Sequence, residues 1–354
     1  MFDIGKIFHD HIEHYPHALT DEQYHAVRDM IRCRTPLMGR GTVYVCHDCG
    51  QKHFIWLSCG NRNCPKCGND KVTEYLQKQQ QNILPVNYFM ITLTLPHELH
   101  SVCRKHPKKV FNIFFDCAQQ AIKELALNKK HLGGHVGIIA TLQTWRRDGE
   151  YHPHIHCLVP GGGISTDKKY WLYPKKRDFL IPAKPLSILL RGKMRTKLQE
   201  SHLSAEIPPE VWKKHWVTDC RNVENGMTSF KYLAPYMQRG FIGNNRIVQY
   251  DGKNVTFKYT DSVTKQTRLR IVSAEEFMNL YLQHVLPHGF QKTRYYGFLG
   301  AANRQTVQEL RKLILCSRYS KLPEPEIFVI PKVLCPHCGH EMKFSYISSR
   351  GPPC

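Results

Sequence analysis

The stretch YFMITLTLP at residues 88–96 is the strongest strand signal in the chain. Large apolar residues stand at every second position, with methionine or threonine between them, which is the period of a β-strand. HVGIIATLQTW at 135–145 and PHIHCLVP at 153–160 also predict strands, and residues 107–128 suit a helix. We therefore expect a mixed domain of strands and helices built around these segments.

The composition of the chain points to a polyanionic partner. Its 354 residues include 50 Lys and Arg against 29 Asp and Glu, a net charge of +21 with histidines neutral. Such a charge favours nucleic-acid binding over the plainer alternative of a generally basic surface. No run of about 18 apolar residues is present, which excludes an integral membrane protein, and no secretory signal is expected. Several of the 14 cysteines form C-x-x-C pairs, which favours metal binding in a reducing cytoplasm over disulfides.

Two of these pairs, Cys46-x-x-Cys49 and Cys64-x-x-Cys67, predict one structural zinc site. Each pair places two thiolates on a tight turn, and two such turns supply the four soft ligands that tetrahedral zinc prefers. Cys59 lies between the pairs and is an alternative ligand that would displace one of the four.

A third pair, Cys335-x-x-Cys338, lies in the Cys- and Pro-rich tail. One pair supplies half of a zinc site, so two further ligands are needed. His340 and Cys354 are nearby candidates, and an unmetallated pair is an equal alternative at this point.

The third predicted strand carries the sequence His152-Pro-His154-Ile-His156. Residues two apart on a strand share a face, about 6.6 Å apart, so adjacent histidines can converge on one metal ion. We expect His154 and His156 to lie on an open face, with Ile155 and the next alternate residues facing the core. A histidine-rich strand without metal is the plainer alternative.

Two tyrosines lie four residues apart in SFKYLAPYMQRG, which predicts a helix over 227–239. Its apolar stripe leaves Tyr232, Tyr236 and Arg239 on the opposite face. Two phenols at this spacing are candidate nucleophiles for phosphodiesters, whereas a pair of packing tyrosines is the alternative. Pro235 removes one backbone hydrogen bond and is expected to kink the helix.

Basic residues beside these motifs are candidate DNA contacts. Some flank the cysteine pairs or the tyrosines, and others lie in an irregular basic segment interleaved with aromatic residues, which suits single-strand binding by charge and stacking. The candidates are Arg62, Lys66, Arg239, Lys175, Lys176 and Arg177.

Together these motifs resemble the two-tyrosine HUH transposases of the insertion-sequence-91 family. YFMITLTLP, the H-P-H-I-H strand with its following glycines, and Y-L-A-P-Y carry the likeness, which covers about residues 30–300. C-H-D-C-G and S-C-G-N-R-N-C-P-K-C resemble that family's N-terminal zinc-binding domain. The expected fold is therefore α+β: an HUH-endonuclease-like antiparallel sheet with flanking helices, an N-terminal zinc-binding module and a candidate C-terminal zinc knuckle.

The resemblance implies rolling-circle transposition. A tyrosine nicks single-stranded DNA at an element end, forms a 5′-phosphotyrosyl link and frees a 3′-OH. His154 and His156 would hold Mg²⁺ or Mn²⁺, and Gln143 on the preceding strand would supply the third ligand; a half-buried amide without metal is an equal alternative. No G-x-x-x-x-G-K-[ST] motif is present, so we expect no nucleotide cofactor.

The sequence predicts three parts and a cytoplasmic, nucleoid-associated protein. These parts are a helical and zinc-binding domain at 1–83, a catalytic domain at 84–315 with a basic insertion at about 165–222, and a tail at 316–354. Expected partners are single-stranded DNA at element ends and target, host replication or unwinding factors, and a second copy of the chain; no membrane is expected. Two alternatives remain: a rolling-circle replication initiator or relaxase, and a non-catalytic zinc-dependent DNA-binding regulator.

Overall fold

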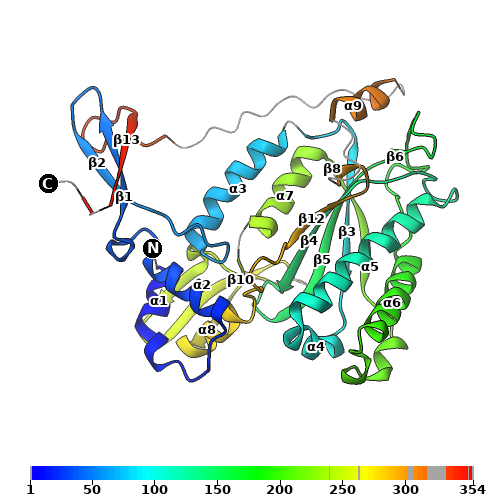
Figure 1. Ribbon diagram of the computed structural model, residues 1–354, viewed down its shortest axis with the longest axis horizontal. Helices are drawn as coiled ribbons and strands as arrows, with labels where there is room; N and C mark the ends of the chain where they lie inside the picture. The colour runs from blue at the N-terminus through cyan, green and yellow to red at the C-terminus, as the bar shows by residue number, and fades with distance from the viewer. Residues whose placement is uncertain are drawn as a thin grey trace.

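The computed structural model describes residues 2–80, 82–238, 240–261, 264–300, 307–316, 332–349 and 351–352. Its central sheet has five strands in the order β12-β4-β5-β3-β8, and each neighbouring pair is antiparallel (Figure 1). The strands span Asn87–Thr94 (β3), Ile138–Trp145 (β4), Tyr151–Pro160 (β5), Thr218–Asn225 (β8) and Thr293–Tyr296 (β12). The predicted α+β fold on an antiparallel sheet is confirmed.

Helices α5 (Pro107–Leu127) and α6 (Ala183–Glu200) cover one face of this sheet, with the short α4 (His100–Lys105) leading into α5 (Figure 1). Alternate strand residues such as Ile91 and Ile155 are fully buried against them. Because side chains alternate between faces along a strand, the residues next to these in sequence point to the opposite face of the sheet.

Helices α3 (Pro65–Gln80) and α7 (Gly226–Gln238) lie side by side on the opposite face (Figure 1). The predicted apolar stripe of α7 is confirmed, because its members are buried against both α3 and the strands. The stripe consists of Phe230, Leu233, Ala234 and Met237. The helix is continuous through Pro235, so the expected kink does not interrupt it.

The N-terminal helices α1 (Ile4–His11) and α2 (Asp21–Arg32) pack against a second sheet and α8 (Ala274–Leu282). Thr20 begins α2 with a reciprocal capping box to Gln23. The second sheet has the order β11-β10-β9, and β9 and β10 form a hairpin that turns at Asp251. Its strands span Ile247–Tyr250 (β9), Asn254–Thr260 (β10) and Thr267–Ser273 (β11).

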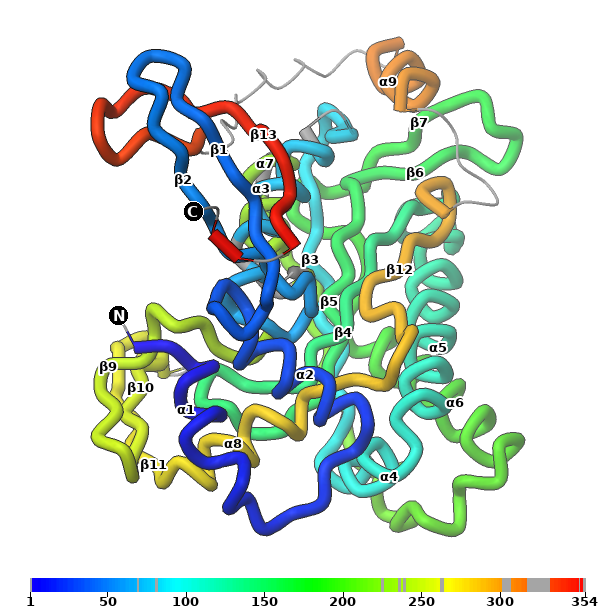
Figure 2. Tube along the Cα trace, turned by 60° about the vertical axis from the view of Figure 1, so that its left-hand side comes forward, coloured from blue at the N-terminus to red at the C-terminus, as the bar shows by residue number. Residues whose placement is uncertain are grey.

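A three-stranded ribbon stands away from this body and joins distant parts of the chain (Figure 2). Its strands are β1 (Gly41–Cys46), β2 (Lys52–Trp56) and β13 (Met342–Ser348), in the order β13-β1-β2. The remaining elements are β6 (Gly163–Ile164), β7 (Trp171–Leu172) and α9 (Val307–Leu315).

The segment expected to form a basic insertion, 165–222, is largely integral to the main fold. Leu186, Leu190 and Met194 of α6 are fully buried in the core beneath the sheet, and β8 forms an edge of that sheet. The basic residues of α6 lie mostly on its outer side. The predicted domain bounds stay a prediction. Among the described helices, none has the length and apolar character needed to span a bilayer.

Candidate metal and tyrosine site

The histidine pair lies in the middle strand of the central sheet. His156 stands between Thr92 and Thr141, and His154 between Thr94 and Gln143. Ile155 faces the α5 core, so the predicted division of the strand into two faces is confirmed. The histidine face is not open, however: His154 and His156 are only 8% and 9% exposed. We attribute this burial to α3 and α7, which cover that side and which strand periodicity cannot reveal.

Burial keeps both imidazoles neutral. Desolvation lowers the pKa of His154 to about 3 and that of His156 to about 4. The Nδ1 of His154 lies 2.6 Å from the carbonyl oxygen of His152, which fixes the proton on Nδ1 and leaves Nε2 with its lone pair. The Nδ1 of His156 lies 3.3 Å from Oγ1 of Thr92. Neutral imidazoles oriented through Nδ1 are the form that ligates metals through Nε2.

Gln143 completes the same face. Its Nε2 donates to the carbonyl oxygen of Trp145 over 3.0 Å, and the residue is only 5% exposed. Its Oε1 is buried without a hydrogen-bond partner among the described residues. Gln143 pairs with His154 on the neighbouring strand. A buried acceptor such as its Oε1 lowers the stability of the fold unless a ligand binds to it. Imidazole nitrogens and an amide oxygen on one face of the sheet are donor types that a divalent ion such as Mn²⁺ accepts.

His284 braces the hairpin that carries Gln143 and the histidines. Its Nε2 donates to the carbonyl oxygen of Gly149 over 3.0 Å, which leaves Nδ1 to accept from Oγ1 of Thr144 at 3.2 Å. The ring stacks on Tyr151 with an interplanar angle of 3°. Desolvation lowers the pKa of His284 to about 3, so this brace is neutral at physiological pH.

Helix α7 crosses the histidine face along β5. At its start, Gly226 lies against Tyr88, which pairs with Pro160 at the far end of β5. Beyond its end, Phe241 lies against Gly149, next to the first residues of β5. The tyrosine helix therefore runs over the same side of the sheet as His154 and His156.

Tyr232 lies away from the buried stripe of α7 and is 46% exposed. This placement agrees with the predicted outward face of the helix. Tyr236 belongs to the last turn of α7. Its side chain and the whole of Arg239 lie outside the described residues, so their predicted positions stay predictions.

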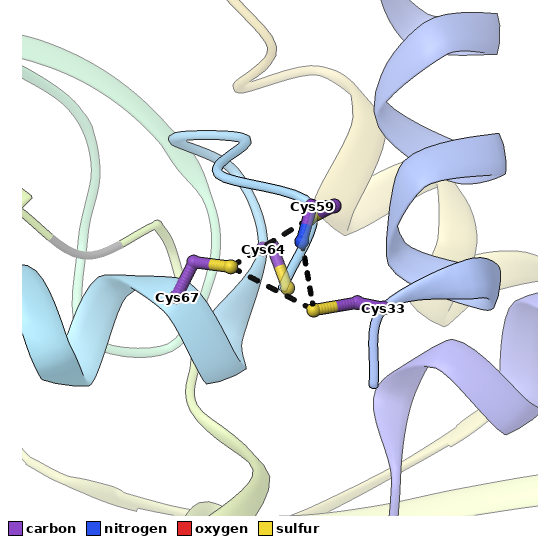
Figure 3. A group of neighbouring side chains, drawn as sticks. All are labelled: Cys33, Cys59, Cys64 and Cys67. Carbon is purple, nitrogen blue, oxygen red and sulfur yellow. Dashed lines mark hydrogen bonds between the residues drawn. The ribbon is translucent and has the colours of Figure 1, made fainter. Parts of the chain in front are cut away.

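The first cysteine cluster combines Cys33, Cys59, Cys64 and Cys67, whose sulfur atoms all lie within 4.8 Å of one another (Figure 3). The Sγ of Cys67 is 3.6 Å from that of Cys33 and 3.7 Å from that of Cys59. A zinc–sulfur length of about 2.3 Å gives a tetrahedral edge of about 3.8 Å, so the cluster fits a structural zinc ion. Cys33 ends α2 and Cys67 lies in the first turn of α3, so the centre ties these helices together.

The second cluster combines Cys46, Cys49, Cys335 and Cys338. The single site predicted from Cys46, Cys49, Cys64 and Cys67 is therefore wrong: the two pairs belong to different centres. Each C-x-x-C pair supplies only two of the four ligands of a tetrahedral site. The fold of the chain determines which other two cysteines complete it. Among the candidate partners of Cys335 and Cys338, His340 is outside the cluster and Cys354 lies outside the described residues.

Sequence analysis missed Cys33, and it gave Cys59 only as an alternative. Neither residue belongs to a C-x-x-C pair, so spacing gives little signal for either. In the structure, Cys33 is the residue that directly follows the last residue of α2, Arg32.

The predicted DNA contacts divide into internal and exposed groups. Arg62 donates to the carbonyl oxygens of Leu286 and Pro287, and burial lowers its pKa. Lys66 donates to the carbonyl oxygen of Cys33 and pairs with Asp3. Arg62 therefore joins the zinc module to the segment at 286–287, and Lys66 makes its contacts within the N-terminal module. Their predicted role as DNA contacts stays a prediction. The cations of Lys175–Arg177 are exposed.

The chain is similar to known proteins over most of its length. Residues 137–306 match the family model described as "Putative transposase", and residues 5–95 match the model described as "Transposase zinc-binding domain". It is 30% identical to "Putative transposase y4qJ" of Sinorhizobium fredii over 336 residues, which is 89% of this chain and 83% of that protein. The chain belongs to the insertion-sequence-91 family of transposases.

A second relative agrees with this family. The transposase is 25% identical over 363 residues to "Transposase for insertion sequence element IS801" of Pseudomonas savastanoi pv. phaseolicola, covering 93% of this chain and 84% of that protein. No solved structure matches the transposase. The matched zinc-binding region contains all four cysteines of the first cluster, so the family domain and the geometry agree on a zinc-binding N-terminal module.

Proposed function

We propose that this transposase nicks and rejoins single-stranded DNA at element ends through a 5′-phosphotyrosyl intermediate and so drives rolling-circle transposition. One arrangement carries the proposal: a neutral, buried histidine pair and the unpartnered Oε1 of Gln143 lie on the sheet face that the tyrosine helix crosses. A purely DNA-binding protein has no use for an unsatisfied buried acceptor beside two oriented imidazoles.

The chemistry is a reversible transesterification. A phenolic oxygen of Tyr232 or Tyr236 attacks the scissile phosphorus, the bond from phosphorus to the 3′ oxygen breaks, and the phenol loses its proton as the 3′ oxygen gains one. The phosphodiester bond energy is kept in the tyrosyl ester, so a 3′-OH can reverse the step at another site. Two tyrosines provide for two successive strand transfers.

His154, His156 and Gln143 would hold Mg²⁺ or Mn²⁺, which neutralises charge on the scissile phosphate when bound. The chain's own contribution is to keep these groups in position before DNA arrives. The carbonyl oxygen of His152 orients the ring of His154, and that of Trp145 orients the amide of Gln143. Preorganised ligands do not have to rearrange during the reaction, which is why such orientation speeds catalysis.

Cationic groups near the histidine pair suit a DNA backbone. A pocket beside His152 and Thr94 is also lined by Arg104 and Arg146, whose guanidinium groups can pair with phosphate oxygens. The exposed run Lys175–Arg177 provides further positive charge, with Tyr170 of the same segment 63% exposed and available for base stacking. Strand separation would be left to host replication or unwinding factors, and a second copy of the chain is an expected partner.

Covalent trapping tests the proposal. Labelled single-stranded DNA from both flanks of the element is incubated with the protein and Mn²⁺ or Mg²⁺, then denatured. We expect a protein–DNA adduct that is lost in Tyr232→Phe/Tyr236→Phe and in His154→Ala. Tyr24→Phe is a matched control, because Tyr24 is 56% exposed on α2. Peptide mapping of the adduct would identify the first nucleophile.

Two results would contradict this mechanism. One is an adduct that survives the double tyrosine substitution. The other is the absence of nicking by metal-loaded protein on DNA that it binds and that carries the element ends. Tight, salt-sensitive binding without nicking would favour the DNA-binding regulator instead.

A further inference from the structure

The second cysteine cluster joins segments from the two ends of the sequence. The Sγ of Cys46 lies 3.5 Å from that of Cys338, and the Sγ of Cys49 lies 3.6 Å from those of Cys335 and Cys338. All four cysteines are free thiols, and the sulfur separations are far longer than the roughly 2.05 Å of a disulfide. They are close to the tetrahedral edge of about 3.8 Å around zinc.

The two halves of this cluster have the same backbone conformation. In one half, the amide of Cys46 donates to the carbonyl oxygen of Gln51 over 2.9 Å, and that of Gly50 donates to the carbonyl oxygen of Cys46 over 2.9 Å. In the other half, the amide of Cys335 donates to His340 over 2.8 Å, and that of Gly339 donates to Cys335 over 2.9 Å.

Each half also closes with a left-handed glycine. The φ angles are +70° at Gly50 and +77° at Gly339, where a side chain would be strained. Each turn stands at the tip of a small hairpin, made by β1 and β2 in one case and by the bridge from Leu334 to Glu341 in the other. Two identical turns, each aiming two thiols at a shared centre, form a complete tetrathiolate ligand set.

We propose that Cys46, Cys49, Cys335 and Cys338 bind a second structural zinc ion, which fastens the C-terminal hairpin to the N-terminal one. The site is distinct from the matched zinc-binding region at 5–95, which contains only two of these four residues. The C-terminal segment thereby becomes part of the N-terminal module, and the ion closes a loop of nearly the whole chain.

Besides the strand ladder that joins β1 to β13, the ribbon has only a small apolar interior. Its buried cluster consists of Cys46, Cys335 and Met342, and Val43 of β1 is also fully buried. Strand β13 is largely exposed, with Phe344 at 59% and Ile347 at 60%. So small an apolar interior cannot offset the entropy of ordering two hairpins, and a metal ion supplies the missing free energy.

Zinc counting on the purified full chain tests the site. We expect two equivalents in the wild type, one in Cys335→Ser/Cys338→Ser, and two in the control Cys316→Ser, because Cys316 is exposed and outside both clusters. The double variant should also become sensitive to limited proteolysis within β13. One equivalent in the wild type, or two in the double variant, would overturn the proposal.

Thiol alkylation of the unmodified protein gives a second measurement that does not depend on a variant folding. Cys46, Cys49, Cys335 and Cys338 should be protected together and released together when a chelator is added. Protection of Cys46 and Cys49 without Cys335 and Cys338 would refute a shared ion. Because neither measurement involves nicking, failure here leaves the proposed strand-transfer activity untouched.

Discussion

His284 makes the stability of this transposase sensitive to acid. The residue is 5% exposed, and burial lowers its pKa from an ordinary 6.5 to about 3. The folded state therefore keeps the ring neutral, whereas the unfolded state takes up a proton as the pH falls below 6.5. The stabilisation is fully present above pH 6.5 and is lost progressively as the pH falls towards 3.

The magnitude follows from the two pKa values. At pH 5 the unfolded state gains about 2 kcal/mol from protonating one such histidine, by proton linkage. His100, His154 and His156 are buried with pKa values lowered to about 4, 3 and 4. The same proton linkage acts at each of these histidines, so all four make the folded state less stable at pH 5 than at pH 8.

Urea denaturation of the zinc-loaded wild type and His284→Gln, at several pH values between 8 and 5, isolates one residue. The amide of glutamine can still donate to the carbonyl oxygen of Gly149, and we expect a loss of about 1–3 kcal/mol at pH 8. Between pH 6 and 5 the variant should lose about 1.4 kcal/mol per pH unit less than the wild type, because it lacks one proton-binding site in the unfolded state. Zinc release affects both proteins equally and cancels in the difference. Parallel pH dependences would refute the reasoning.

Four other substitutions probe the site and its supports. Gln143→Ala should weaken Mn²⁺ binding at least about tenfold in a titration. Unchanged affinity would exclude Gln143 as a ligand. Leu233→Ala should cost about 2–5 kcal/mol in urea denaturation, because Leu233 is fully buried between α7 and α3. Cys64→Ser should remove one zinc equivalent and unfold the start of α3, seen as lost helical circular dichroism; full zinc retention would contradict the first centre. Replacing the three cations of Lys175–Arg177 by alanine should reduce the salt-dependence slope of single-strand binding by about 2, and an unchanged slope would place the DNA elsewhere.

Local pattern was sufficient where a side chain's role depends on its own strand or helix. The alternation around His154 and His156 placed them opposite the α5 core, and the helical period placed Leu233 in the stripe and Tyr232 outside it. Both results follow because period 2 and period 3.6 fix the direction of a side chain relative to its own element.

Prediction from local sequence patterns was wrong or silent where a residue's contacts are made with a segment far away in the chain. Arg62 and Lys66 donate to backbone carbonyl oxygens of other segments, which no local pattern predicts. Their charge alone suggested DNA, because a cation near a zinc motif has the same sequence signature whether it faces solvent or its own chain. Strand β8 was not predicted, because its sequence is polar. Such a sequence can form a strand at the edge of a sheet, where one side of the strand has no neighbouring strand.

By itself, the sequence determined that the protein has strand-borne histidines, a two-tyrosine helix and thiol pairs suited to zinc. Only the tertiary structure decided how the thiols are shared, with Cys33 and Cys59 completing one centre and Cys335 and Cys338 completing the other. The physical reason is that a C-x-x-C turn is a local structure that fixes two ligands, whereas a tetrahedral ion needs four. Which two turns meet depends on the packing of α2 against the body and on the pairing of β13 with β1, contacts between residues far apart in the chain.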